Sequence, residues 1–123
     1  GDGNQKRDFT YVSDVVDAFI KAAHSECPGD VFNVGSGKPQ SINTLVSLLE
    51  GPVEYIPKRP GEPDCTHADI QKIKSKLNWA PHISFSEGVQ RMINHIDYWK
   101  NAPVWDADSI QIATKDWFNA LQQ

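Results

Sequence analysis

The apolar residues in the first half of the chain form short β-type runs separated by turns and one helical stripe. Phe9–Val12 (FTYV) is aromatic and β-branched, which predicts a short strand. Ser13 is a suitable N-cap and Asp14 would lie in the first turn, where the helix dipole favours an anion, so a helix over 14–23 should follow. Two more runs predict strands: Val31–Val34, which suits a buried strand, and Val53–Ile56, which alternates as a half-buried strand does. The apolar face of the helix over 14–23 consists of Val15, Val16, Phe19, Ile20 and Ala23.

The second half of the chain has mainly helical periodicity. Ser41 is expected to cap a second helix that ends at Gly51-Pro52. The apolar spacing over 70–77 predicts a third helix, a fourth should begin at Ser86, and a fifth should follow Ala102-Pro103. Early strands that alternate with helices, followed by a helical half, indicate an α/β fold with about five helices.

Length, charge and cysteine usage exclude several classes of protein. A chain of 123 residues corresponds to about one domain. Its net charge of −4 gives no electrostatic support for nucleic-acid binding, and no apolar run approaches the roughly 18 residues of a membrane span. Cys27 and Cys65 are interpreted as reduced cytosolic thiols. The sequence begins with Gly1 and its single methionine is Met92, so we expect a piece of a longer protein.

Three familiar kinds of site are not supported by the residue spacing. Gly35-Ser36-Gly37 follows an expected strand, but Gln40 stands at the sixth position of the dinucleotide fingerprint and Pro39 alters the loop, so a tight turn is the interpretation. No serine, histidine and aspartate form a recognisable triad. The histidines have no metal-ligand spacing and are interpreted as surface or capping residues. They are His24, His67, His82 and His95.

Two polar stretches next to expected strands carry the candidate chemistry. One is 5–8 (QKRD) and the other is 58–64 (KRPGEPD). An arginine fork binds phosphate oxygens in a bidentate way, and nearby carboxylates can accept hydrogen bonds from sugar hydroxyls. The alternative is that both arginines form ordinary surface ion pairs, Arg7 with Asp8 or Asp2 and Arg59 with Glu62. The residues alone leave both interpretations open.

Three separately spaced motifs resemble a known family. GDGNQKRDFTYVSDVVDAFIKAA, FNVGSGKPQSINTLVSLL and RPGEPDCTHADIQKIKSKLNWAP, in that order, resemble the C-terminal third of the extended short-chain dehydrogenase/reductases, the NAD-dependent nucleotide-sugar epimerases and dehydratases. The resemblance implies a substrate-binding C-terminal region over 1–100, with most of the Rossmann domain missing. The segment 101–123 does not belong to the common pattern and is interpreted as a helical extension.

The resemblance assigns roles to four residues. Arg7 and Arg59 are implied to bind the diphosphate of a nucleotide sugar, and Glu62 to bind the nucleoside ribose. Gln5 lies where the family's loop passes the nucleotide. Asp14 is interpreted as a helix-start residue, and the N-V-G-S-G motif at 33–37 as mainly structural.

No catalytic residue and no metal ligand are assigned to this chain. The family's NAD fingerprint and its Tyr-x-x-x-Lys pair belong upstream, and none of the three tyrosines here has a lysine four positions later. The resemblance therefore implies a cytoplasmic enzyme of cell-surface polysaccharide biosynthesis whose NAD is bound by the missing N-terminal domain. The chain itself is expected to be catalytically silent.

Partners follow from the same resemblance. They are a nucleotide-diphosphate sugar and a second subunit of a full-length homodimer, while nucleic acid and membrane are not expected. An isolated piece would expose apolar surface and is expected to associate with itself. A different class of function stays open at this point, namely a free-standing, non-catalytic module that binds a nucleotide or a protein.

Overall fold

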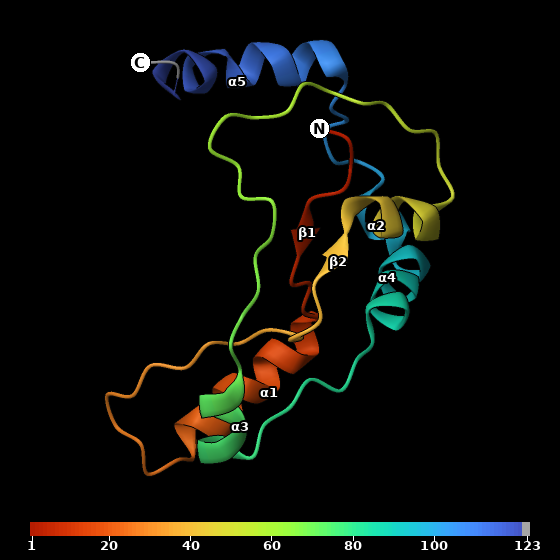
Figure 1. The fold of residues 1–123 in the computed structure, drawn as a ribbon. Coiled ribbons are helices and arrows are strands. Elements are labelled where there is room, and N and C mark those ends of the chain that lie inside the picture. The colour runs from red at the N-terminus through yellow and green to blue at the C-terminus, as the bar shows by residue number, and fades with distance from the viewer. Residues whose placement is uncertain (122–123) are drawn as a thin grey trace.

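The computed structural model describes residues 1–121 (Figure 1). The last two residues of the expected extension over 101–123 lie outside this range. Within the described range the chain forms five α-helices, one 3-10 helix and a two-stranded sheet, as the sequence predicted for the fold class. The elements in order are β1 (Lys6–Arg7), α1 (Val12–Ala23), β2 (Gln40–Ser41), α2 (Ile42–Leu49), α3 (Gln71–Leu77), α4 (Phe85–Asn94), η1 (Ile96–Trp99) and α5 (Ala107–Leu121).

Helices occupy opposite ends of the molecule, with the small sheet between them (Figure 1). Figure 1 shows α1 and α3 at one end of the molecule, α5 at the opposite end near the N-terminus, and the sheet between these ends. Helices α2 and α4 are in contact beside the sheet. In the sheet β1 is antiparallel to β2, with Lys6 opposite Ser41 and Arg7 opposite Gln40.

The core lies between α1 and α3. Ile73 and Trp79 are each only 1% exposed, so nearly all of their apolar surface is removed from water. Burial of this kind stabilises a fold by about 1.5–3 kcal/mol for each large apolar side chain. The buried cluster consists of Ala18, Ile70, Ile73, Leu77 and Trp79.

The three strand predictions made from β-type runs are wrong. Phe9–Val12, Val31–Val34 and Val53–Ile56 are not strands, and the short strands lie elsewhere, at Lys6–Arg7 and Gln40–Ser41. The physical reason is that β-type sequence becomes a strand only when a neighbouring strand pairs with it. Among the described residues no strand pairs with these runs, and Val31 is 79% exposed.

The helix starts are only partly as predicted. Ser41 caps α2 as expected, because its hydroxyl oxygen accepts from the Thr44 amide at 3.0 Å. Helix α1 instead begins at Val12 with no side-chain cap, so the assignment of Ser13 as its N-cap is wrong. Helix α4 is capped by Ser84, two residues before the expected start at Ser86, and Ser84 accepts from the Glu87 amide at 3.3 Å.

Asp14 has a larger structural role than a helix start. It does lie in the first turn of α1, but it is 3% exposed and its Oδ2 accepts from the Ile83 amide at 3.0 Å. The Trp79 indole N–H donates to the Asp14 carbonyl oxygen at 3.1 Å. Asp14 therefore joins α1 to the segment that connects α3 with α4.

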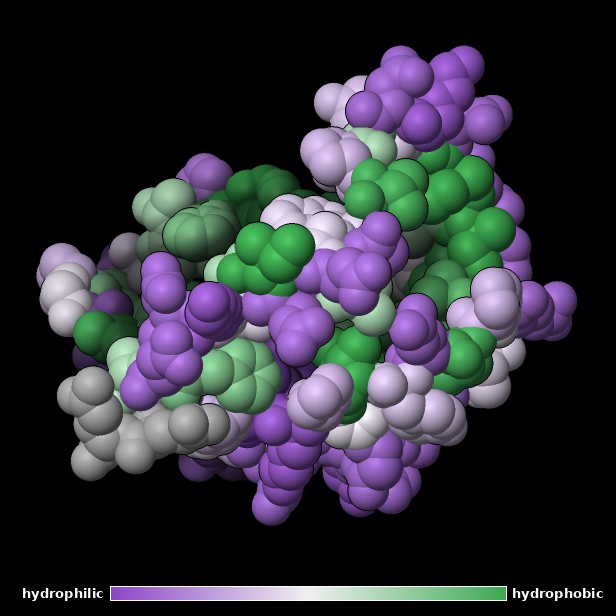
Figure 2. Space-filling model, turned by 90° about the horizontal axis from the view of Figure 1, so that it is seen from above, coloured by the Kyte–Doolittle hydropathy of each residue, from purple (hydrophilic) through white to green (hydrophobic). Residues whose placement is uncertain are grey.

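Large apolar side chains remain on the surface. Figure 2, which looks down on the end that carries α5, shows apolar patches interrupting the polar surface. On α1, Phe19 is 73% exposed and Ile20 is 52% exposed, although both belong to the predicted apolar face. None of the helices in the described range is long and apolar enough to cross a membrane.

Candidate functional site

Backbone hydrogen bonds bring the two predicted polar stretches together. The Lys6 amide donates to the Asp64 carbonyl at 2.8 Å, and the Thr66 amide donates to the Lys6 carbonyl at 3.1 Å. On the other side of this strand, the Ile42 amide donates to the Gln5 carbonyl at 3.1 Å. Segments 5–7, 40–42 and 64–66 therefore lie side by side, which places Arg7 next to Glu62.

Arg7 is held by three hydrogen bonds. Its Nη2 donates to Glu62 Oε1 at 2.7 Å, and its Nη1 donates to the carbonyl oxygens of Lys6 at 2.8 Å and Pro63 at 2.9 Å. Both side chains of this ion pair are about three-quarters buried, with 23% of Arg7 and 28% of Glu62 exposed. The sequence selected both residues as site residues but left their mutual contact unpredicted. The alternative pairings of Arg7 with Asp8 or Asp2, and of Arg59 with Glu62, are not formed.

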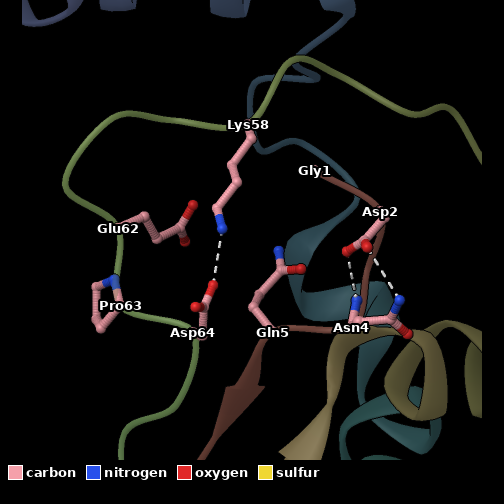
Figure 3. A pocket seen from close by; sticks show the side chains of 8 residues that line it. All are labelled: Gly1, Asp2, Asn4, Gln5, Lys58, Glu62, Pro63 and Asp64. Carbon is pink, nitrogen blue, oxygen red and sulfur yellow. Dashed lines mark hydrogen bonds and ion pairs between the residues drawn. The ribbon is translucent and has the colours of Figure 1, made fainter.

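Gln5 and Glu62 line a shared cavity of about 360 Å³, called here the acidic cavity (Figure 3). Lys58 Nζ donates to Asp64 Oδ1 at 2.8 Å across it, and this hydrogen bond raises the pKa of Lys58. Hydrogen bonds from Asn4 lower the pKa of Asp2. Of the three carboxylates in the lining, Glu62 is paired with Arg7 and Asp64 with Lys58, and their free oxygens can accept hydrogen bonds from hydroxyl groups. Its lining residues are Gly1, Asp2, Asn4, Gln5, Lys58, Glu62, Pro63 and Asp64.

Arg59 lies at a different cavity from Gln5 and Glu62. It lines a space of about 620 Å³ between the segment 55–59 and α5, called here the α5 cavity. Its guanidinium carbon lies 5.7 Å from the centroid of the Trp117 ring. Lys58 and Arg59 thus line different cavities although they are neighbours in the sequence. The structure brings Gln5, Arg7 and Glu62 together and directs Arg59 towards α5.

Asp8 was considered in the sequence only as an ion-pair partner of Arg7, but in the structure it connects distant segments. One carboxylate oxygen accepts from the Ser36 amide at 2.7 Å and from the Ser36 hydroxyl, and the other accepts from the amides of Gly37 at 3.2 Å and Ala68 at 3.0 Å. Burial of the Asp8 carboxylate acts to raise its pKa, but these hydrogen bonds outweigh burial and hold the pKa below its ordinary value of 3.8. Its partners lie 28 to 60 positions away in the sequence, so no local pattern marks this role.

The loop at 35–37 is a close-packed turn, as the sequence predicted. A Cβ at Gly35 would lie 2.5 Å from the Ala68 Cβ and 2.7 Å from Asp8 Oδ2, so only glycine fits. The amides of Ser36 and Gly37 are already bonded to Asp8 and do not point to a free anion site. In the described part of the chain, no group of three or more His, Cys, Asp or Glu side chains is placed to hold a metal ion.

Comparison with known proteins identifies the family. The family model of GDP-mannose 4,6 dehydratases matches residues 1–92. The chain therefore belongs to this family of NAD-dependent nucleotide-sugar epimerases and dehydratases, and the resemblance to extended short-chain dehydrogenase/reductases is confirmed. The match ends before α5 begins.

Relatives and solved structures agree with this assignment. A UDP-glucuronate 4-epimerase of Thermodesulfobacterium geofontis is 40% identical over 101 residues, which cover 76% of this chain and 31% of that protein. The crystal structure of UDP-glucose 4-epimerase from Thermotoga maritima with UDP-glucose superposes with a TM-score of 0.74 at 34% identity, covering 80% of this chain and 33% of that one. The structure of MoeE5 with UDP-glucuronic acid and NAD gives 0.75 at 33% identity, covering 80% and 35%. The chain thus spans about a third of the length of these proteins.

Proposed function

We propose that this chain is the substrate-binding region of an NAD-dependent nucleotide-sugar epimerase or dehydratase and that it holds the nucleotide diphosphate of the substrate. The support is the family, together with relatives whose names specify UDP-sugars. The observation that carries the proposal is the ion pair between Arg7 and Glu62 at 2.7 Å. It joins residues 55 positions apart, from two family motifs, at the edge of a cavity.

The contacts of Arg7 leave capacity for a ligand. A guanidinium has five N–H donors, and three of those on Arg7 bond to protein oxygens within the described chain. The remaining two can bind an oxygen of the diphosphate. Glu62 has a second carboxylate oxygen that can accept from a ribose hydroxyl, and the Gln5 amide lines the same cavity. Arg59 is also proposed to bind the diphosphate; because it lines the α5 cavity and not the acidic cavity, the support for this role is its place in the family motif.

The turn Gly35-Ser36-Gly37 resembles part of a dinucleotide fingerprint, but its surroundings do not fit the pyrophosphate of NAD. The Asp8 carboxylate occupies the amides of Ser36 and Gly37, and its negative charge would repel a phosphate there. We infer that a segment outside this chain binds NAD in the full-length enzyme. When bound there, NAD would supply the hydride chemistry of the reaction.

The chain alone is proposed to be catalytically silent. None of its three tyrosines has a lysine four positions later, the spacing that the family's catalytic pair requires. We expect the purified chain, supplied with NAD, to convert neither UDP-glucose nor GDP-mannose when the products are separated chromatographically. Measurable epimerisation or dehydration would contradict this part of the proposal.

The diphosphate role is tested with Arg59→Ala in the full-length enzyme. Loss of a charge-assisted contact of about 1.5–3 kcal/mol should weaken binding of UDP- and dTDP-sugars roughly ten- to hundredfold in calorimetric titrations. Arg91→Ala is the matched control, because Arg91 pairs with Glu87 on the exposed surface of α4 and should leave affinity unchanged. Unchanged affinity of the Arg59→Ala variant would refute the diphosphate role.

The remaining parts of the proposal concern assembly and location. The full-length enzyme is proposed to be a homodimer that acts in the cytoplasm in cell-surface polysaccharide biosynthesis, and the support for this is the family alone. Self-association of the isolated chain has structural support, because apolar residues of α1 are exposed.

A further inference from the structure

Arg59 is oriented by an aromatic ring of α5. Its guanidinium carbon lies 5.7 Å from the Trp117 ring centroid, within the roughly 6 Å over which a cation–π interaction acts. Among the described residues, the Arg59 side chain forms no ion pair and donates no hydrogen bond to a protein acceptor. Within residues 1–121 this guanidinium is therefore held by the Trp117 ring and not by a protein oxygen.

This contact differs in kind from those of Arg7. Arg7 uses three N–H donors on protein oxygens, whereas a guanidinium over an aromatic ring is attracted through the charge and keeps its N–H groups for other acceptors. The Trp117 contact thus holds Arg59 in place and leaves its N–H donors available to a phosphate. Of the two arginines, Arg59 has the larger number of available donors.

Trp117 is not placed as a core residue. Its side chain is 41% exposed, and its other aromatic contact is an edge-on one with the adjacent Phe118, with ring centroids 5.9 Å apart. Helix α5 lies beyond residues 1–92, which the family model matches, and it forms one wall of the α5 cavity opposite Tyr55–Arg59. A cavity of about 620 Å³ is within the size range of small-molecule sites.

We propose that Trp117 is a positioning residue for the substrate diphosphate. The Trp117 ring on helix α5 holds the Arg59 guanidinium, so that the free N–H donors of Arg59 face the phosphates at the α5 cavity. This inference rests on the proposed function, since it assumes that Arg59 binds the diphosphate. It assigns to α5, which the family match does not include, a direct effect on substrate affinity.

The test is a double-mutant cycle in the full-length enzyme, with UDP as the probe and uridine, which has no phosphate, as its matched control. Trp117→Leu removes the ring and keeps apolar bulk, and it should weaken UDP binding about three- to fivefold, the effect of an exposed cation–π contact. Uridine affinity should not change. Trp117→Phe should restore part of the loss, and Trp105→Leu, at an exposed tryptophan that forms no cation–π contact with Arg59, should have no effect.

The cycle separates failure of this inference from failure of the proposed function. If Trp117 acts through Arg59, then Trp117→Leu should cause no further loss in the Arg59→Ala background. An equal loss in both backgrounds, or a loss of uridine affinity, would mean that Trp117 does not act by orienting Arg59, and would overturn the inference. No loss from Trp117→Leu, with a clear loss from Arg59→Ala, would overturn the inference and leave the proposed function standing. No loss from Arg59→Ala, or no UDP binding by the unsubstituted enzyme, would overturn both.

Discussion

The carboxylate of Asp8 connects three segments, so replacing it with asparagine should destabilise the chain strongly. In the native protein each of its two oxygens accepts two hydrogen bonds, from Ser36 on one side and from Gly37 and Ala68 on the other. Asparagine keeps one oxygen and puts an N–H₂ donor in place of the second. With the amide nitrogen turned towards Gly37 and Ala68, two hydrogen bonds are lost and donors face donors. With the nitrogen turned towards Ser36, it can donate to the Ser36 hydroxyl but faces the Ser36 amide donor, and in both orientations the negative charge is lost.

The magnitude follows from the number and kind of bonds. A hydrogen bond to a charged group contributes about 1.5–3 kcal/mol, and water can replace part of it at this partly exposed site. We expect Asp8→Asn to lower the free energy of unfolding by about 2–4 kcal/mol. At about 4 °C per kcal/mol for a chain of this size, the melting temperature should fall by about 8–16 °C.

The assay is thermal unfolding followed by circular dichroism at neutral and acidic pH. Because the folded pKa of Asp8 lies below 3.8, its stabilising contribution is complete above that pH and is lost as the pH falls through the folded pKa. The difference between the native protein and Asp8→Asn should therefore shrink on acidification. Asp116→Asn, which makes the same change at an exposed position of α5, should have little effect. Equal melting temperatures for the two variants at neutral pH would refute the reasoning.

Three further variants test the packing, the cap and the exposed surface. Gly35→Ala adds a Cβ that would lie 2.5 Å from a neighbouring methyl carbon, so it should cost about 1–3 kcal/mol in chemical denaturation, whereas Gly51→Ala, with open space around it, should not. Ser41→Ala removes an observed cap and should cost about 1 kcal/mol, while Ser13→Ala should cost clearly less, and equal losses would contradict the observed cap positions. The chain should self-associate in sedimentation velocity, and Phe19→Ser should reduce this association; a monomer at all concentrations would contradict it.

The elements that the sequence predicts well are those whose signals are local. Helices α2 to α5 are predicted by the apolar spacing within each helix. The Ser41 cap is predicted because its partner, Thr44, is only three positions away. The family could also be recognised from the sequence, because its motifs are continuous stretches of residues. The roles of Asp8 and Asp14 could not be read in the same way. Asp14 bonds to a residue 69 positions away, and no local pattern specifies that partner.

At the candidate site, the sequence predicts which residues belong to the site but not how their side chains are arranged. The motifs select Gln5, Arg7, Arg59 and Glu62 as site residues, but they do not say which cavity each side chain faces. The contact of Arg59 with Trp117 depends on a helix that begins 48 positions later, at Ala107, in a segment without a family pattern. A sequence motif can therefore place an arginine at a site without showing what orients it.

The wrong strands and the exposed face of α1 have a common physical cause. Strand formation requires hydrogen-bond partners on a neighbouring strand, and an apolar helix face requires a surface that covers it. The run Val31–Val34 has β-type sequence and the α1 face has helical periodicity, yet Val31 is 79% exposed and Phe19 is 73% exposed. Covering a large apolar side chain is worth about 1.5–3 kcal/mol, so these sequences favour contacts that the described residues do not supply. The chain spans about a third of its relatives' length, and we infer that in the full-length enzyme further strands pair with Val31–Val34 and cover α1.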